Sequence, residues 1–325
     1  MRRIVSFAAA ALAIACALGG MAQTQDYPSR PIKLVLPQPP GGAIDLISRA
    51  LGERLAEQMK QPVIVENMPG ANGGLAAGQV ARSAPDGYTL FMAVDTNLVV
   101  NPNLYPNLAY DPARDFAPIG VLAKVSLVLV ANPKVPADNV RELIDFAKKN
   151  PGKLNYASIG LGTQSHLGME LFKMTTGTDI NLVSYRGTAP AMTDVVAGQV
   201  DVMFTGPPSA KAMSEGGRLK ILAVGGKRRL GLMPDVPTLD ESGVPGYELT
   251  GWFGMVAPAR TPEPVLAQLA YEVRKAAADA RFGDRITAQG LEVVGGSATE
   301  MRALMHADTE KWAAVIKATG TRIAQ

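Results

Sequence analysis

Short apolar runs alternate with longer segments whose apolar positions recur every three or four residues. The first pattern predicts strands and the second predicts helices, and their alternation is typical of βαβ units with parallel strands. In the first third of the chain, the predicted strands are 32–36, 63–66 and 88–94, and the predicted helices are 43–59 and 75–83. Residues 97–115 are rich in Pro, Asn and Tyr and are predicted to be a loop region.

A second set of alternating elements follows and predicts a second, smaller sheet. The predicted helices are 140–149, 165–176 and 189–197, and the predicted strands are 154–158, 181–185, 200–204 and 220–224. Two long amphipathic helices, 262–280 and 299–319, close the chain.

Two apolar runs lie at the borders of these sets. Residues 119–132 are too many for an ordinary strand, and 251–257 form an apolar strand between Gly and Pro, so both runs are predicted to cross between lobes. The fold class is therefore α/β with two lobes, each a sheet flanked by helices. The expected first lobe comprises 23–124 and 258–325, and the expected second lobe comprises 125–257.

The amino terminus predicts export. Two arginines precede an apolar run at 4–18, and small residues follow up to Ala22, which is typical of a secretory signal peptide over 1–22. We expect cleavage near Ala22 and a periplasmic protein. The alternative is a lipoprotein acylated at Cys16, but the usual leucine three positions earlier is missing.

Charge and cysteine content indicate which partners and which cross-links to expect for the mature chain. Without 1–22 the chain keeps 30 of its 32 Lys and Arg against 29 Asp and Glu, and it loses its only cysteine. No disulfide is then expected, and the balanced charge does not favour nucleic acid as a partner. No later apolar stretch is long enough to span a membrane.

The strongest local signal is the segment 35–49, VLPQPPGGAIDLISR, in which a strand runs through a Pro-Pro-Gly-Gly turn into a helix. Prolines fix φ, glycines leave their N–H groups uncovered, and a helix start adds unpaired donors and a positive dipole end. The loop is a candidate anion site, although alone it could simply reverse the chain. Its candidate ligand-binding residues are Gln38, Pro40, Gly41, Gly42, Ala43 and Asp45.

A second loop that combines glycines with a helix start lies at 160–166. Its glycines bare the backbone, its hydroxyls suit ligand oxygens or helix capping, and its histidine is either a cation facing a carboxylate or a capping or packing residue. The spacing is not that of a dinucleotide-binding loop. The candidates here are Gly160, Gly162, Thr163, Ser165 and His166.

Two further strand ends offer polar groups. Arg186, followed by Gly187 and Thr188, provides a fixed cation that could clamp a carboxylate or remain solvated. The triplet at 95–97 supplies short polar side chains, of which the carboxylate suits a ligand ammonium or its own loop. Its members are Asp95, Thr96 and Asn97.

Catalytic and metal motifs are absent from the sequence. It contains no Gly-x-Ser-x-Gly, HExxH, cysteine pair or Walker loop, so no catalytic residue, metal or cofactor is expected. The one acid–base pair that remains as an alternative joins His166 to Asp201 or Asp45. Asp201 is also a candidate ligand-binding residue, whereas His306 is interpreted as a surface residue of the last helix.

Longer motifs along almost the whole predicted mature chain resemble the Bug-type periplasmic solute receptors of tripartite tricarboxylate transporters. The motifs are YPSRPIKLVLPQPPGGAIDLISR (27–49), ENMPGANGG (66–74), APDGYTL (84–90), NPNLYPNLAYDPARDFAPI (101–119), PGKLNYASIGLGTQSHLGMELF (151–172), VSYRGTAPAMTDVVAGQVDVMF (183–204), PDVPTLDESGVPGYE (234–248) and GWFGMVAPARTP (251–262).

This resemblance implies a two-lobed periplasmic-binding-protein fold of type II, a Venus flytrap that binds a small carboxylate without chemistry. It also implies delivery of the ligand to the permease subunits of a transporter by a receptor that we expect to be monomeric. The resemblance places the ligand between loops 39–43, 95–97, 160–166 and 186–188. Sensing for a signalling system and, less favoured, a secreted enzyme remain the alternative functions.

The chain departs from the family pattern in its first two loops. Gln38 stands where relatives often have an aromatic residue, and Ile44 stands where a Thr or Ser-like residue is common. Asn72 and Ala76 replace glycines common in the second loop. These positions are where the ligand preference is expected to differ.

Overall fold

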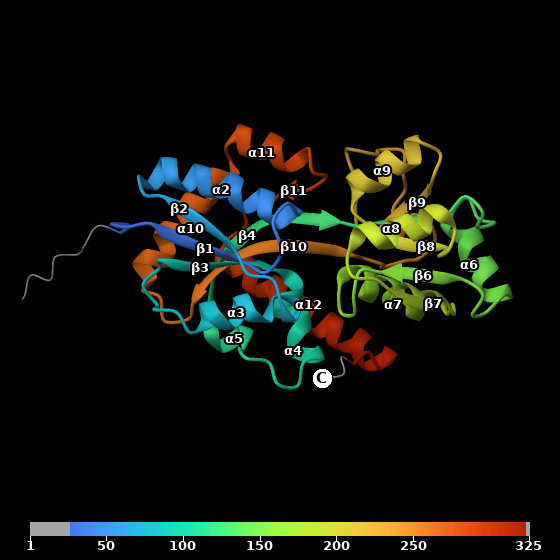
Figure 1. Ribbon diagram of the computed structural model, residues 1–325, viewed down its shortest axis with the longest axis horizontal. Helices are drawn as coiled ribbons and strands as arrows, with labels where there is room; N and C mark the ends of the chain where they lie inside the picture. Colours follow the sequence, from blue (N-terminus) through green and yellow to red (C-terminus); the bar gives the residue numbers. More distant parts are fainter. Residues whose placement is uncertain (1–26, 323–325) are drawn as a thin grey trace, which may run out of the picture.

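The computed structural model describes residues 27–322, so the expected signal peptide and Cys16 lie outside the described residues. Two sheets lie side by side along the long axis of the molecule, and helices cover both faces of each (Figure 1). The six-stranded sheet has the order β11-β4-β10-β3-β1-β2, and the five-stranded sheet has the order β7-β6-β8-β5-β9. The expected α/β fold with two lobes is confirmed.

The first sheet separates two layers of apolar side chains. Its strands are β1 (Ile32–Leu36), β2 (Val63–Asn67), β3 (Thr89–Val94), β4 (Phe116–Ser126), β10 (Thr250–Pro258) and β11 (Glu292–Val293). Alternate residues of β1 and β3 face opposite sides, as a pleated strand requires. One face packs on α2 (Ala43–Met59), α10 (Glu263–Ala277) and α11 (Ala280–Thr287), and the other on α3 (Gly74–Ala81) and α12 (Ala298–Thr319).

The second sheet is covered in the same way. Its strands are β5 (Val128–Ala131), β6 (Asn155–Ser158), β7 (Asn181–Ser184), β8 (Val202–Thr205) and β9 (Lys220–Val224). One face packs on α6 (Val140–Lys149) and α7 (Gln164–Thr176), and the other on α8 (Thr188–Ala197) and α9 (Pro207–Glu215).

Strand direction brings the functional loops of the two lobes face to face. β10 runs from the second lobe into the first and is antiparallel to β3, so β3 and its parallel neighbours β1 and β2 end toward the second lobe. β5 runs away from the first lobe and is antiparallel to β8, so β8, β6 and β7 end toward the first lobe. The carboxyl edges of the two sheets therefore face each other across the lobe border, which is where the cleft between the lobes is expected.

Two chain crossings join the lobes at one hydrogen-bonded junction. The Leu127 carbonyl accepts from the Gly225 amide at 2.7 Å, and the Gly225 carbonyl accepts from the Leu249 amide at 2.7 Å. Both predicted crossing runs are found here, the first as β4 and β5 and the second as β10. β10 pairs with β3 and β4 from Thr250 onward, so it belongs to the first sheet, and the second crossing precedes the expected border at 257/258.

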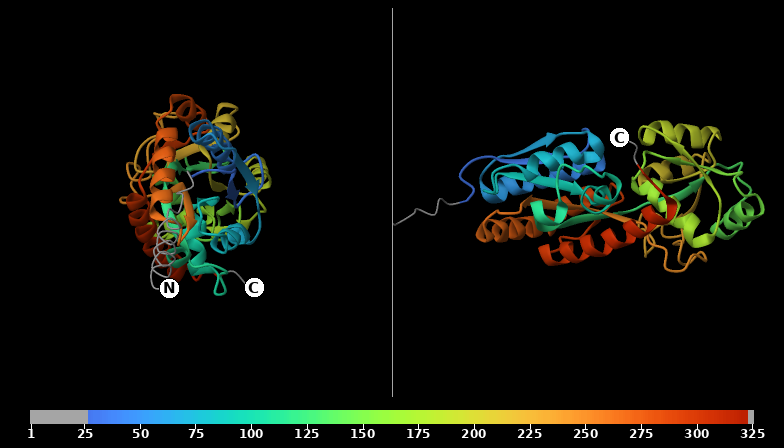
Figure 2. Two further views of the ribbon diagram at one scale, coloured as in Figure 1. Left: turned by 90° about the vertical axis from the view of Figure 1, so that its left-hand side faces the viewer. Right: turned by 90° about the horizontal axis from the view of Figure 1, so that it is seen from below.

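The carboxyl-terminal helix adds a third connection on one side of the junction. α12 begins at a capping box formed by Ser297 and Glu300, and it packs on both β4 and α7 (Figure 2). One apolar cluster runs through both lobes here, from Phe116 and Trp312 to Phe172 and Tyr247. α12 thus fills one side of the lobe border.

Short helices account for most differences from the sequence prediction. The predicted loop at 97–115 contains η2 (Thr96–Val100), a π-helical turn, and α4 (Asn101–Leu104) and α5 (Pro112–Asp115). η1 (Ala71–Gly73) and α9 were also not predicted, although the two prolines that open α9 are typical of a helix start. The predicted helix 262–280 ends early because the Asp279 side chain caps a separate helix, α11.

The close approach of β4 to the start of α12 makes a specific stability prediction. A Cβ on Gly120 would overlap the Gly296 carbonyl oxygen, so the backbone must move. We expect Gly120→Ala to lower the free energy of unfolding by about 1–3 kcal/mol. Gly283→Ala, inside α11 with open space around its Cβ, is the control and should raise it by about 0.5–1 kcal/mol. Urea unfolding of both variants tests this, and equal effects would contradict it.

Candidate functional site

The loop between β1 and α2 forms one wall of the cleft. Gly42 is the N-cap of α2 and provides no side-chain cap, so the first amides of the helix have no acceptor within it. The Leu46 amide is the one that bonds to the Gly42 carbonyl, at 3.1 Å. The amides of Gly42 and Ala43 have no acceptor among the described residues, so both are candidate donors for a ligand, whereas Ile44 is fully buried.

Asp45 supports this loop from behind. Its carboxylate accepts from the Gly41 amide at 3.0 Å, from Asn67 Nδ2 at 3.0 Å and from Arg49 Nε at 3.1 Å. Burial opposes its ionisation, but the hydrogen bonds from Arg49, Gly41 and Asn67 outweigh burial and hold the pKa of Asp45 below its usual value. Asp45 and the Gly41 amide thus bond to each other and hold the turn.

A small pocket lies beside this loop, between it and the carboxyl ends of β2 and β3. It has a volume of about 180 Å³. Its lining residues are Pro37, Gln38, Pro39, Pro69, Gly70, Asn72, Gly73, Val94, Thr96 and Asn97. Gln38, Thr96 and Asn97 were expected at the site, and Asn72 was expected to affect the ligand preference; Pro69, Gly70 and Gly73 were not singled out.

The three polar residues after β3 differ in whether their side-chain groups are already hydrogen-bonded within the protein. Asn97 is buried, and its side chain accepts from the Val94 amide at 3.0 Å and donates to the Asn72 carbonyl at 2.8 Å. Thr96 lines the pocket, and no described residue bonds to its hydroxyl. Asp95 accepts from the Thr96 amide at 2.6 Å and, across the lobe border, from Gln164 Nε2 at 2.7 Å.

Asp95 is the most perturbed acid of this region. Burial raises its pKa to about 7, with Gln164 and the Thr96 amide opposing the shift and Asp308 adding to it. Gln164 lies directly against β10, because a Cβ on Gly251 would overlap its amide group. This hydrogen bond therefore belongs to the junction of the lobes, and Asp95 holds its own loop and the α7 start.

The loop between β6 and α7 is closed by its own side chains. Thr163 Oγ1 donates to the Gly160 carbonyl at 2.7 Å, and Ser165 Oγ accepts from the Ile159 amide at 3.2 Å. His166 Nδ1 accepts from the Gly162 amide at 3.3 Å, and burial lowers the pKa of His166 below its ordinary value. His166 is thus a neutral packing residue and does not present a cation to a ligand.

The loop between β7 and α8 is open. Gly187 is the N-cap of α8 and provides no side-chain cap, so the first amides of this helix also lack acceptors within it. Arg186 is exposed, and within the described residues nothing bonds to or pairs with its guanidinium. Thr188, at the first helical position, is exposed beside it.

Asp201 was expected to bind the ligand, but it does not lie at the edge where the other candidates lie. It lies at the amino end of β8, so it is at the far edge of the second sheet from the cleft. There its carboxylate accepts from the Asn155 amide at 2.7 Å, and its carbonyl accepts from the Asn132 amide at 2.8 Å. Because His166 is buried and bonded within its own loop and Asp45 is bonded within another, neither acid forms the alternative acid–base pair with it.

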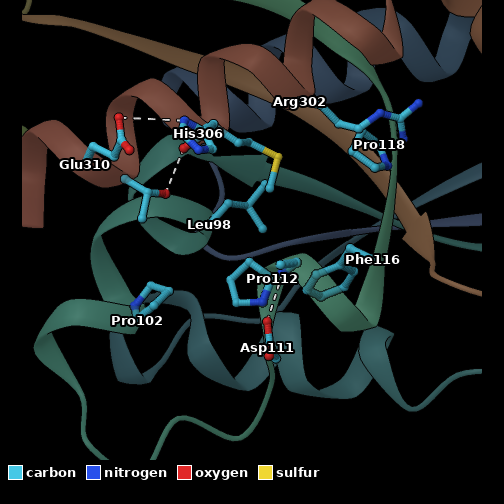
Figure 3. Close-up of a pocket in the computed structure, with 12 residues that line it drawn as sticks. Leu98, Pro102, Asp111, Pro112, Phe116, Pro118, Arg302, His306 and Glu310 are labelled. Carbon is cyan, nitrogen blue, oxygen red and sulfur yellow. Dashed lines mark hydrogen bonds and ion pairs between the residues drawn. The ribbon is translucent and has the colours of Figure 1, made fainter.

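A larger pocket of about 490 Å³ lies away from these edges, between α12 and the segment around α4 and α5 (Figure 3). Leu98, Phe116 and Met305 line it with polar residues at its rim. His306 is an exposed rim residue 3.7 Å from Glu310, which confirms its interpretation as a surface residue. No expected ligand-binding residue lines this pocket, so size alone does not identify the site.

Over residues 27–322 the structure contains no cluster of His, Cys, Asp and Glu that could hold a metal ion. None of the described helices is long and apolar enough to cross a membrane.

Comparison with known proteins identifies the family of this chain. The model of the tripartite tricarboxylate transporter family receptor, TctC, matches residues 47–321. The chain belongs to this receptor family. Protein BugT of Bordetella pertussis is 34% identical over 298 residues, 91% of each chain. The expected resemblance to Bug-type receptors is confirmed.

Two solved structures of similar proteins carry carboxylates. R. palustris Rpa4515 with adipate has a TM-score of 0.82 at 34% identity and covers 92% of this receptor and 100% of its own chain. MatC from Rhodopseudomonas palustris with bound malate has a TM-score of 0.77 at 32% identity and covers 89% and 100%. The family is thus one of solute-binding receptors whose structural relatives hold small carboxylates.

Apart from Asn72, the sequence analysis missed two parts of the cleft wall. The segment from Pro69 to Gly73 follows β2 as a Pro-Gly turn, the same signal as in the first loop, and could have been found by it. Gly206, the N-cap of α9, follows β8 at the same edge, but the two prolines after it remove the first helical donors.

The burial of Asp95 predicts how the stability of the receptor depends on pH. A folded pKa of about 7 exceeds the unfolded value of about 3.9, so the folded state binds more protons between them and stability falls as pH rises through this range. We expect Asp95→Asn to gain about 2–3 kcal/mol relative to the wild type between about pH 5 and about pH 8. Urea unfolding at both pH values measures it, with exposed Asp179→Asn as the control. Parallel pH profiles for Asp95→Asn and the wild type would contradict it.

Proposed function

We propose that this receptor captures a small carboxylate in the cleft between its lobes, in the periplasm, and delivers it to the permease subunits of a tripartite tricarboxylate transporter. One observation carries the proposal. The uncapped amino termini of α2 and α8 lie at the two sheet edges that face each other across the cleft. An anion between them accepts hydrogen bonds from both lobes and links them.

The electrostatics favour an anion over a neutral solute. Each helix start contributes unpaired donors and a positive dipole end, worth about 0.3–1 kcal/mol for an exposed charge. Arg186 adds a full positive charge beside α8, while Asp45 is bonded to Arg49 behind its loop. Relatives that hold adipate and malate support a carboxylate as the anion.

A sensing role would use the same cleft. The two roles differ in the protein that recognises the ligand-bound, closed receptor. The discriminating experiment is therefore a pull-down with the membrane proteins encoded nearby, with and without ligand. Ligand-dependent capture of permease subunits supports transport, and capture of a signalling protein in their place overturns it. The secreted enzyme remains the less favoured alternative, because the pair that it depended on, His166 with Asp201 or Asp45, is not formed.

A carboxylate panel tests the proposal directly. The protein is unfolded, dialysed and refolded to remove bound solute, and thermal shift is recorded with mono-, di- and tricarboxylates. A ligand at 100 times its Kd should stabilise the receptor by about 2.7 kcal/mol. A flat response across the panel would overturn the proposal.

Gly42→Val should block the α2 donors while leaving the fold intact. The backbone at Gly42 is extended, with φ −81 and ψ 172, and the nearest atom to a new Cβ is Gln38 Oε1 at 3.7 Å, so valine fits but covers the amides. We expect at least a tenfold loss of affinity, about 1.4 kcal/mol. Gly216→Val, at the outer end of α9, is the matched control and should bind normally. Unchanged affinity in Gly42→Val would show that the loop is only a turn.

Arg186→Gln should weaken binding by removing the cation of the second lobe. The guanidinium is exposed, so we expect a loss of about five- to twentyfold at low ionic strength that shrinks as salt is added. Isothermal titration at two salt concentrations measures this. Arg228→Gln, another exposed arginine of the second lobe, is the control. A salt-independent loss, or none, would argue against a charge contact at Arg186.

A further inference from the structure

Another pocket, of about 500 Å³, lies at the lobe border on the other side of the crossing strands from the candidate ligand loops. Its lining comes from β4, α11 and β11 in the first lobe and from loop 228–232, after β9, in the second (Figure 1). β11 and β9 are the outermost strands beyond β4 and β5, whereas the candidate loops follow β1 to β3, β6 and β7. No expected ligand-binding residue lines this border pocket.

The two lobes already approach each other beside the border pocket. A Cβ on Gly290, in the turn before β11, would lie 2.9 Å from Cδ of Pro208 at the start of α9. An arginine nitrogen of Arg228, in the second lobe, lies 4.0 Å from Oε1 of Glu292 in the first. A solute held in the border pocket therefore contacts both lobes at once.

Cations outnumber acids in the lining of the border pocket, since three of its side chains are basic and Glu292 is acidic. Lys124 is half-buried, and no described residue forms an ion pair with it. Arg228 and Glu292 are both exposed and only 4.0 Å apart, so their pairing contributes little to stability. Arg229 is held in place by Glu241 at 2.9 Å. Lys124 and Arg228 are thus the cations that an incoming anion can use.

Neutral donors add to these charges. The Met233 amide donates to the Leu230 carbonyl at 3.0 Å and closes a tight turn. The amides of Gly231 and Leu232 inside this turn have no acceptor among the described residues, and both residues line the border pocket. Backbone amides of turns commonly form concave sites for anions. The border pocket therefore offers donors from both charge and backbone.

We propose that the border pocket binds a compact oxyanion with at least two negative charges, of the phosphate or pyrophosphate type, between Lys124 of the first lobe and Arg228 of the second. The anion replaces Glu292 as the partner of Arg228 and accepts hydrogen bonds from the turn amides. Because each lobe contributes one cation, a monovalent anion can neutralise only one of them and binds more weakly. The inference goes beyond the proposed carboxylate capture, since the two sites share no residue.

The volume suits such an anion. About 500 Å³ corresponds to about 17 water molecules at about 30 Å³ each, so pyrophosphate fits together with water that remains bound to it. An anion of this size reaches a group of each lobe and links the lobes at this edge.

Isothermal titration of the refolded receptor with pyrophosphate, phosphate and chloride at low ionic strength tests the site. We expect pyrophosphate to bind most tightly, phosphate less tightly and chloride not measurably. Lys124→Gln and Arg228→Gln should each weaken pyrophosphate binding at least fivefold. Arg274→Gln, exposed on α10, removes the same charge elsewhere and should change it less than twofold. Equal losses in all three variants would indicate attraction to the overall charge only and would overturn the site.

Glu292→Gln removes the competing acid and should tighten pyrophosphate binding about three- to tenfold. A gain of affinity cannot result from misfolding, so this variant complements the two losses. Glu263→Gln, exposed at the start of α10, is the matched control and should leave the affinity unchanged. Unchanged or weaker binding in Glu292→Gln would place the anion outside the border pocket and overturn the inference.

Variants of the cleft separate this inference from the proposed function. Gly42→Val and Arg186→Gln should leave pyrophosphate binding unchanged, and Lys124→Gln should leave carboxylate binding unchanged. Pyrophosphate binding that is lost in the cleft variants but kept in Arg228→Gln would place the anion in the carboxylate site, which overturns this inference and leaves carboxylate capture standing. Failure of every carboxylate to bind the wild type, with pyrophosphate still bound, would overturn the proposed function alone.

Discussion

The antiparallel pairing of β10 with β4 and β3 sets the direction of the other strands and, through them, the position of the site. The chain crosses from the first lobe through β4 and returns through β10, and the two strands pair from Thr250 to Pro258. Parallel strands β1 to β3 must then end toward the second lobe, while β6 to β8 end toward the first. Helix starts follow strand ends, so unpaired amides gather on both sides of one cleft.

In this arrangement, the hydrogen bonds of the buried acid Asp45 determine which backbone amides of the first loop have no acceptor. Asp45 bonds the Gly41 amide and leaves those of Gly42 and Ala43 without acceptors. In the α7 loop, hydroxyls and His166 use the local donors, so this loop acts as a support. The proposed ligand recognition is thereby concentrated on α2 and α8, whose N-cap glycines lack a side-chain cap. α9 also begins at a glycine on this edge, Gly206, but the two prolines that follow remove its first donors.

The filled side of the junction restricts how the lobes can move. α12 packs on both lobes, Trp252 Nε1 donates to Asp308 at 2.8 Å, and Lys311 Nζ donates to the Glu248 carbonyl at 2.6 Å. The bond from Gln164 to Asp95 lies at the same border. Closure is therefore expected as rotation about this side, which brings α8 and Arg186 toward α2 and its pocket.

The sequence by itself determined most of the longer elements and the loops that follow the strands. Helices 43–59 and 140–149 match α2 and α6 residue for residue, because apolar spacing and clear stop signals are local properties. Tertiary structure decided which candidates form the site, because the deciding partners are distant in the chain: Asp45 meets Asn67, and Asp95 meets Gln164. Asp201 looked equivalent to the other strand-end residues until the direction of β8 placed it at the far edge. Spacing along a chain predicts the donors that a loop carries, but burial and long-range hydrogen bonds determine which of them a ligand can reach.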